Sequence, residues 1–311
     1  MARTAYRFGW TKMHAAMAVV LVGLGGVASW TAWVDIWHIA IKDEEASHVF
    51  LVPLVAAWLV WVRRARLRLC EPRWNWIGPL AVAAGWAMST YGYRFAVQSF
   101  WHGGAVLMVI GCLLSVLGGD VLIRFLPAFA VLVFLVPIPG SLRQAIAIPL
   151  QNATAQVTQS LFEVLGVPVE RSGNLLSIGG TPVTIAEACN GMRMVFALVL
   201  VSFAFSFGEP LRNYVRFLIL AACPLSAILC NVIRMLPTLW LYGYGDKVVA
   251  FFGVQPGEGR TLNDLGRSLA DKFHDLSGWV MLLIAFLLLM GIIRLMRWAL
   301  IPVNRYTLAV D

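Results

Sequence analysis

The sequence predicts an all-α, polytopic integral membrane protein with about eight transmembrane helices. Composition is the first reason, because the 311 residues are 60% hydrophobic and only 13% charged. A soluble domain is roughly 45–50% apolar and about 25% charged. The second reason is that strongly basic loops alternate with loops that carry few basic residues, as the loops of membrane proteins do.

Eight apolar stretches use up the chain, since a spanning helix needs about 20 residues. They fall at about 14–34, 47–62, 76–93, 102–118, 122–138, 188–207, 217–242 and 276–296. We expect the first to be a retained span, although Val27-Ala28-Ser29 resembles a weak signal-peptide cleavage site, because the apolar run continues beyond it. The chain 1–311 is thus expected to form a single membrane domain.

Positive charge sets the orientation, because cytoplasmic loops carry an excess of Lys and Arg. The loops assigned to the cytoplasm contain Arg3, Arg7, Lys12, Arg63, Arg64, Arg66, Arg68, Arg73, Arg124, Arg212, Arg216, Arg294 and Arg297. The first outer loop, 35–46, is acidic instead. Both termini are therefore expected in the cytoplasm, and the two long segments 139–187 and 243–275 are expected on the outer side.

The outer segment 139–187 has a pattern of its own. Residues 141–165 place apolar side chains at intervals of three or four, which predicts an amphipathic helix at the membrane interface. Residues 167–185 then read as two short extended pieces joined by Gly/Asn turns.

Charge and cysteine content exclude several other functions. A net charge of +8 with 13 Trp could suit nucleic acid, but basic loops and interfacial tryptophans are equally typical of membrane proteins. We expect membrane lipids as partners, and no nucleic acid. The five cysteines are too few and too scattered for a disulfide framework. No CxxC or CxxH pair is present, so a structural zinc site is not expected. We expect neither a metal nor an organic cofactor.

Three reactive side chains are predicted at one depth, near the outer face. Cys189 begins the sixth span from outside, and His274 immediately precedes the eighth. Arg234 lies about 17 residues past the inner end of the seventh span, or about 25 Å across a core of about 30 Å. The orientation of the spans was assigned from loop charge alone, without using these three residues. Their agreement in depth therefore indicates a shared functional site.

Each of the three also has an ordinary interpretation. Cys189 could be a small apolar filler, Arg234 an anchor that extends to the interface, and His274 a plain loop residue. However, an ionisable residue inside a membrane is costly and points to function. Asn231, one turn before Arg234, adds a second polar group to that helical face. Cys230 on the same face is a rival nucleophile, but it lies deeper.

The combination is suited to acyl transfer. A helix N-terminus and the nearby Arg193 favour the Cys189 thiolate, which would attack a peptide carbonyl to form a thioester. His274 would protonate the leaving amine and then activate the second nucleophile. Either Arg234 or the backbone N–H groups of Asn190-Gly191 would stabilise the oxyanion. Arg193 could also orient the substrate or only anchor the helix.

These residues sit in motifs that resemble those of the exosortase/archaeosortase family of membrane cysteine transpeptidases. The segment Glu187-Ala188-Cys189-Asn190-Gly191-Met192-Arg193 resembles the family's nucleophile motif. Asn231-Val232-Ile233-Arg234 and His274-Asp275-Leu276-Ser277-Gly278-Trp279 resemble its second and third motifs. The runs Ser47–Pro53, which contains His48, and Leu161–Asn174 are similar too. The resemblance covers about residues 35–300.

The resemblance implies a bacterial inner-membrane enzyme whose active site faces the periplasm. Its substrates would be secreted proteins that end in a Pro-Glu-Pro-like (PEP-CTERM) sorting signal, a transmembrane helix and a basic tail. It would cleave near the signal and transfer the protein to an acceptor, in connection with exopolysaccharide production. Cys189 would be the nucleophile, Arg234 the thioester or oxyanion stabiliser, and His274 the acid and base. The supporting or substrate-binding residues would be Glu187, Asn190, Gly191, Arg193, Asn231 and His48.

Two departures from the family pattern matter. Position 190 is Asn where many members have Ser, so no hydroxyl acts there. No soluble domain follows the eighth span, so a small accessory protein is a further candidate partner. The motif around His48 has no role that its residues explain, and ordering the first outer loop is the simpler expectation.

Two other functions remain as alternatives. A transporter or channel could use Arg234 as a binding charge, but it should show midplane polar residues and repeat symmetry, and neither is clear in the spans. The second alternative function is that of an inactive scaffold in an exopolysaccharide assembly.

Overall fold

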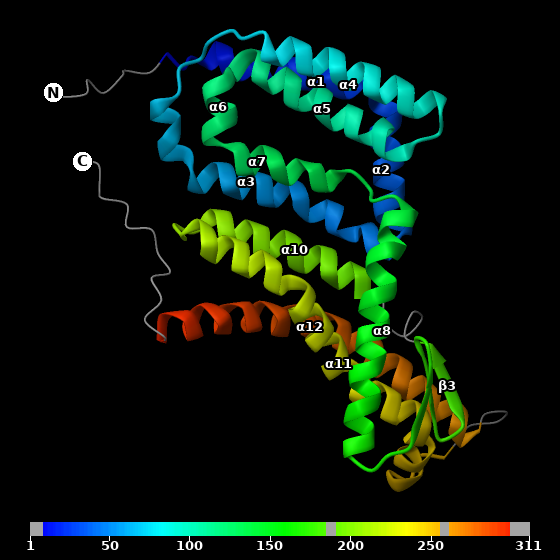
Figure 1. Cartoon of the computed structure of the whole chain (residues 1–311). Coiled ribbons are helices and arrows are strands. Elements are labelled where there is room, and N and C mark those ends of the chain that lie inside the picture. Colours follow the sequence, from blue (N-terminus) through cyan, green and yellow to red (C-terminus); the bar gives the residue numbers. More distant parts are fainter. Residues whose placement is uncertain (1–8, 185–190, 256–260, 299–311) are drawn as a thin grey trace. The chain divides into compact units, whose positions relative to one another are not determined.

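The computed structural model describes residues 9–184, 191–255 and 261–298, most of them in helices. The chain divides into two compact units. The first unit comprises Met1–Gly140 and Phe203–Glu209, and the second comprises Ser141–Ser202 and Pro210–Asp311. Figure 1 shows their elements, and each unit is treated by itself. A helical protein with short extended segments was expected, and this part of the prediction is confirmed.

The first unit is built from helices of very different lengths. They are α1 (Lys12–Ala28), α2 (Trp30–Lys42), the 3-10 helix η1 (Glu44–Leu51), α3 (Val52–Val62), η2 (Arg64–Leu69), α4 (Ile77–Arg94), α5 (Gln98–Leu117), α6 (Gly119–Arg124), α7 (Leu126–Ala130) and η3 (Val131–Leu135). The α4–α5 pair packs backbone against backbone. A Cβ atom at Gly85 would lie 2.7 Å from the carbonyl oxygen of Gly104, and one at Gly111 would lie 2.6 Å from the nitrogen of Val82. Such glycine seams are typical of helices that pack within membranes.

In this unit, a basic residue from a predicted cytoplasmic loop caps the C-terminal end of a helix. Arg63 donates from Nη2 to the carbonyl oxygen of Phe207 over 2.7 Å. Phe207 lies in the last turn of α10 (Gly191–Gly208), where carbonyl groups have no partner within the helix. A cation is also favoured there by the helix dipole.

The second unit contains the small sheet and the longest helices. Its elements are α8 (Gly140–Val164), β1 (Val169–Ser172), β2 (Leu175–Ile178), β3 (Thr181–Thr184), most of α10, α11 (Asn213–Phe251) and α12 (Leu262–Trp298). The strands form one antiparallel sheet in the order β1-β2-β3. Ile178 pairs with Thr181, so Gly179 and Gly180 form a two-residue turn with φ of 56° and 78°, as such hairpins require. The expectation of two extended pieces is wrong in number, because this turn divides the second piece.

The sheet packs on α8 and α11, and both helices run towards it. The shared apolar core consists of Ala155, Phe162, Val169, Leu176, Ile178, Val183, Met235 and Leu239. Val164, the last residue of α8, is separated from β1 by only a short connection. A Cβ atom at Gly243, well along α11, would lie 2.9 Å from Cγ2 of Ile178. The C-terminal halves of α8 and α11 therefore lie at the sheet (Figure 1).

Helices α11 and α12 form an antiparallel hairpin next to the sheet. A Cβ atom at Gly245 would lie 2.9 Å from the carbonyl oxygen of Gly266. Nearby, the hydroxyl of Tyr242 donates to the carboxylate of Asp271. These two contacts fix the register between the helices.

Replacement of Gly266 by valine should destabilise this hairpin by about 1–3 kcal/mol, since overpacking forces the backbones apart. A Cβ atom at Gly266 would lie 2.6 Å from the nitrogen of Asp246. Thermal unfolding of the purified protein in one detergent measures the loss. Gly291→Ala is the control, because Gly291 has open space around it and alanine favours helix. Equal melting temperatures for Gly266→Val and the unmodified chain would contradict this packing.

The predicted count of eight spans is not confirmed. Within the described residues, α5 and α11 are long and apolar enough to cross a membrane. Up to four spans result if two bent helix pairs each count as one, namely α1 with α2, bent by 79°, and Leu126–Leu135 with α8, bent by 95°. Among the other predicted stretches, 47–62 falls partly on α3, which has only 11 residues, while 188–207 and 276–296 include residues that the structure does not fully describe.

The two long segments that were predicted to lie on the outer side contain more helix than expected. In 243–275, α11 continues to Phe251 and α12 begins at Leu262, so His274 lies inside a helix rather than before one. In 139–187 the predicted helix 141–165 is confirmed as α8. Its buried residues are Ala147, Thr154, Ala155, Thr158 and Phe162. Val157 and Leu161 of the expected apolar stripe are instead exposed, as suits a helix whose apolar side meets lipid.

Candidate active site

One face of α11 carries most of the polar groups of the candidate site. Residues Asn231, Arg234, Thr238, Tyr242 and Gly245 follow one another at intervals of three or four, so they lie along one side of the helix. Arg234 is 2% exposed. Tyr242 and Gly245 contact α12, and Asn231 contacts α8. Arg234 thus lies on the face that turns towards both neighbouring helices.

Asn231 joins α11 to α8 through its side chain. Its Nδ2 donates to Oγ1 of Thr154 over 3.5 Å, and both side chains are buried. Further along α11, the hydroxyl of Thr238 donates to the carbonyl oxygen of Arg234 over 2.8 Å. The backbone on either side of Arg234 is therefore tied by polar contacts as well as by the apolar core.

His274 lies on α12, partly buried. In an antiparallel helix pair, residues that come later in one helix lie opposite residues that come earlier in the other. Tyr242 faces Asp271, so His274, three residues later on α12, is level with Leu239 on α11. Leu239 is five residues beyond Arg234, or about 7.5 Å along the axis. The structure thus brings Arg234 and His274 to adjacent turns of one helical hairpin.

The predicted nucleophile lies outside the described residues, together with Glu187 and Asn190. Cys189 is flanked in the sequence by Thr184, the last residue of β3, and by Gly191, the first residue of α10. Both of these neighbours belong to the second unit, as do Arg234 and His274. Arg193 follows Gly191 within α10, and its side chain is not among those described.

The other four cysteines are poor nucleophiles. Cys70, Cys112, Cys223 and Cys230 are all buried, and a reactive thiol needs access to its substrate. Burial also raises the pKa of the Cys70 thiol, and two smaller effects oppose each other, because Arg124 lowers this pKa and Asp120 raises it. Cys230, the rival candidate on α11, is fully buried.

His48 lies in a different part of the chain from these residues. It belongs to η1 of the first unit and is buried. It is not one of the residues that the second unit brings together, and its role stays a prediction.

Sequence reasoning missed a buried polar pair in the first unit. Nε2 of His102 on α5 lies 2.9 Å from Oδ2 of Asp35 on α2, and His102 is fully buried. A histidine at the start of the fourth predicted span could have been noticed, since ionisable residues in membranes are costly and often functional. Its partner lies 67 positions away in the sequence, and no local pattern links the two.

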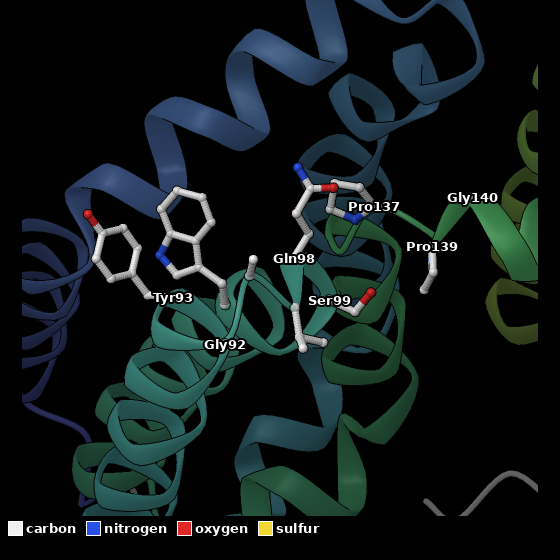
Figure 2. A pocket seen from close by; sticks show the side chains of 10 residues that line it. Gly92, Tyr93, Gln98, Ser99, Pro137, Pro139 and Gly140 are labelled. Carbon is white, nitrogen blue, oxygen red and sulfur yellow. The ribbon is translucent and has the colours of Figure 1, made fainter.

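The first unit also contains an open cavity of about 600 Å³. Figure 2 shows Tyr93, Gln98 and Ser99 on one part of its wall and Pro137 and Pro139 on another. None of the predicted site residues that the structure describes lines it. Elsewhere in the described chain, no group of three or more His, Cys, Asp or Glu side chains could hold a metal ion.

Comparison with known proteins adds one finding. The family model described as transmembrane exosortase (Exosortase_EpsH) matches residues 30–291. The match covers most of the 311 residues, including every candidate site residue from His48 to His274. Neither a curated protein nor a solved structure matches the chain.

Proposed function

Since the chain belongs to the transmembrane exosortase family, we propose that it is a membrane-embedded cysteine transpeptidase. It cleaves the C-terminal sorting signal of secreted proteins, a Pro-Glu-Pro-like motif followed by a transmembrane helix and a basic tail. The cleaved protein is then transferred to an acceptor, in connection with exopolysaccharide production. Both termini are cytoplasmic, and the active site faces the periplasm of the bacterial inner membrane.

The observation that carries this proposal is the position of Arg234 and His274 on adjacent turns of the α11–α12 hairpin. A buried guanidinium suits a developing negative charge, and a partly buried imidazole suits proton transfer. The described neighbours of Cys189, Thr184 and Gly191, belong to the same unit. The proposed nucleophile, oxyanion stabiliser and proton-transfer group therefore all belong to the second unit of the chain.

In the proposed reaction, the thiol of Cys189 gives its proton to His274 and its sulfur attacks the peptide carbonyl. Arg234, with the backbone N–H groups of Asn190-Gly191, stabilises the oxyanion. His274 returns the proton to the leaving amine as the C–N bond breaks, which leaves a thioester. It then takes a proton from the incoming nucleophile, which attacks the thioester, and gives that proton to the sulfur of Cys189 as the C–S bond breaks.

The remaining predicted residues support these steps. Glu187 and Arg193 flank the nucleophile in the sequence, and Arg193 favours its thiolate. Asn231 lies one turn before Arg234 and binds or orients the substrate. His48 orders the first outer loop. The transmembrane helix of the substrate reaches the site from the surrounding lipid, and a small accessory protein is a candidate partner.

Substitution of Arg234 tests its proposed role as the oxyanion stabiliser. We expect Arg234→Ala to slow processing about 100- to 1,000-fold, as loss of an oxyanion donor does. Arg234→Lys should recover little, because an ammonium lacks the planar fork of donors. The assay is cleavage of a secreted reporter with the sorting signal, helix and basic tail, in cells that hold equal amounts of full-length protein. Arg171→Ala, at an exposed position on β1, is the control.

Two outcomes would favour the other functions. Flux of a solute that depends on Arg234 but not on Cys189 would indicate a transporter or channel. Full exopolysaccharide output with a Cys189→Ala/His274→Ala double variant, together with no reporter cleavage by the unmodified chain, would indicate a scaffold with an inactive site.

A further inference from the structure

The buried face of α8 is more polar than a packing face needs to be. Thr154 and Thr158 lie one turn apart on it, and both are essentially inaccessible to solvent. In helices, buried hydroxyls commonly donate to the carbonyl oxygen one turn earlier. Among the described residues, the hydroxyls of Ser29, Thr90, Ser115 and Thr238 do so. Within the described chain, Oγ1 of Thr158 has no hydrogen-bond partner.

A second buried polar atom faces the same seam. Asn231 uses its Nδ2 to bind Thr154, while its Oδ1 is buried and has no partner among the residues described. Asn231 is 8% exposed. The seam between α8 and α11 therefore holds a hydroxyl and an amide oxygen, both with unused hydrogen-bonding capacity.

These groups lie at the level of the candidate site. Thr154 meets Asn231, and α8 and α11 both run towards the sheet. Thr158 is one turn nearer the sheet than Thr154, and Arg234 is about one turn nearer than Asn231. Thr158 is therefore level with Arg234, to within about one or two residues along the axis.

Buried hydrogen-bonding groups without a partner destabilise a folded protein. Binding of a transmembrane substrate would explain why this chain has two of them at the seam. To be cut, its helix must unwind locally, and the freed N–H and C=O groups cannot remain unpaired in an apolar medium. The Asn231 amide oxygen can accept from a substrate N–H, and the Thr158 hydroxyl can donate to a substrate carbonyl.

We propose that Thr158 and Asn231 bind the unwound peptide backbone of the substrate beside the bond that is cleaved. This inference rests on the proposed transpeptidase function and names a binding subsite for it. Thr154 is a positioning residue, because it holds Nδ2 of Asn231 and leaves Oδ1 facing the seam. The peptide enters between α8 and α11, which meet through side chains.

The test uses Thr158→Val, which removes the hydroxyl and keeps the shape of the side chain. We expect the efficiency of reporter cleavage, measured with purified full-length protein in detergent, to fall about tenfold, with most of the change in KM. The melting temperature should stay equal or rise, because a buried unpartnered hydroxyl is lost. Thr158→Ser should stay within about twofold of the unmodified protein. Thr90→Val is the matched control, since it removes a hydroxyl that is satisfied within α4.

Two results would overturn the inference. Cleavage by Thr158→Val at the unmodified rate, with a higher melting temperature, would make the hydroxyl a packing feature only. Loss of cleavage together with a lower melting temperature, not restored in Thr158→Ser, would make it structural. The proposed function is checked separately with Cys189→Ala. If that variant is inactive and Thr158→Val is fully active, only the subsite fails; if Cys189→Ala still cleaves, the transpeptidase itself fails.

Discussion

Cys189→Ala is expected to abolish reporter processing, with a decrease of about 10⁴-fold or more, as removal of a covalent nucleophile does in comparable enzymes. Without the thiol no thioester forms, and neither Arg234 nor His274 can replace it. The measurement is the ratio of precursor to cleaved reporter in cells, with the variant present at the same level as the unmodified chain. Because alanine is small and apolar, the amount of folded protein should be unchanged.

The matched control is Cys230→Ala. Cys230 lies on α11, one turn before Arg234, and is fully buried. Its loss should leave processing within about twofold, apart from a small packing cost. Full processing by Cys189→Ala would remove the proposed nucleophile. Loss of processing only in Cys230→Ala would transfer that role to α11.

His274→Ala should slow processing about 10²- to 10⁴-fold, the range that general acid–base groups contribute. His274→Gln should be nearly as slow, because an amide keeps hydrogen bonding but cannot carry the proton to the leaving amine. Added imidazole should restore part of the rate to His274→Ala, since a free base can take over the proton transfer. The readout is the rate of reporter cleavage by purified protein at several imidazole concentrations.

His38→Ala is the control for these variants, because His38 is an exposed residue of α2 in the first unit. It should leave the rate unchanged. A His274→Gln variant that cleaves at the unmodified rate would exclude proton transfer by this residue and leave it a role in the packing of α12.

Much of the helical architecture is predictable because apolar length and loop charge act locally. The stretch 102–118 corresponds to α5, and 217–242 lies within α11. The breaks were not predictable in the same way. The bend between α1 and α2 occurs at Ser29, in a run that is otherwise mostly apolar. Whether such a run continues straight depends on neighbours distant in sequence.

Part of the candidate site follows from the sequence for a physical reason. Arg234 and His274 lie on consecutive antiparallel helices, so the helix ends next to their connection had to be neighbours. Asn231 and Arg234 share a face because helical periodicity puts them there. The contact of Thr154 with Asn231 spans 77 positions and depends on which side of α8 is buried. The apolar pattern of α8 pointed to a neighbouring side of the helix instead, because in a membrane apolar side chains can face lipid and small or polar ones face neighbouring helices.

The central claim is that Cys189 carries the substrate as a thioester, and trapping that intermediate tests it most directly. Full-length protein is mixed with the sorting-signal substrate without an added amine acceptor, quenched in acid, digested and examined by mass spectrometry. We predict a substrate fragment attached to the peptide that contains Cys189, released by hydroxylamine and absent from Cys189→Ala. Cleavage of the substrate with no such adduct, or with the adduct on another residue, would contradict the account.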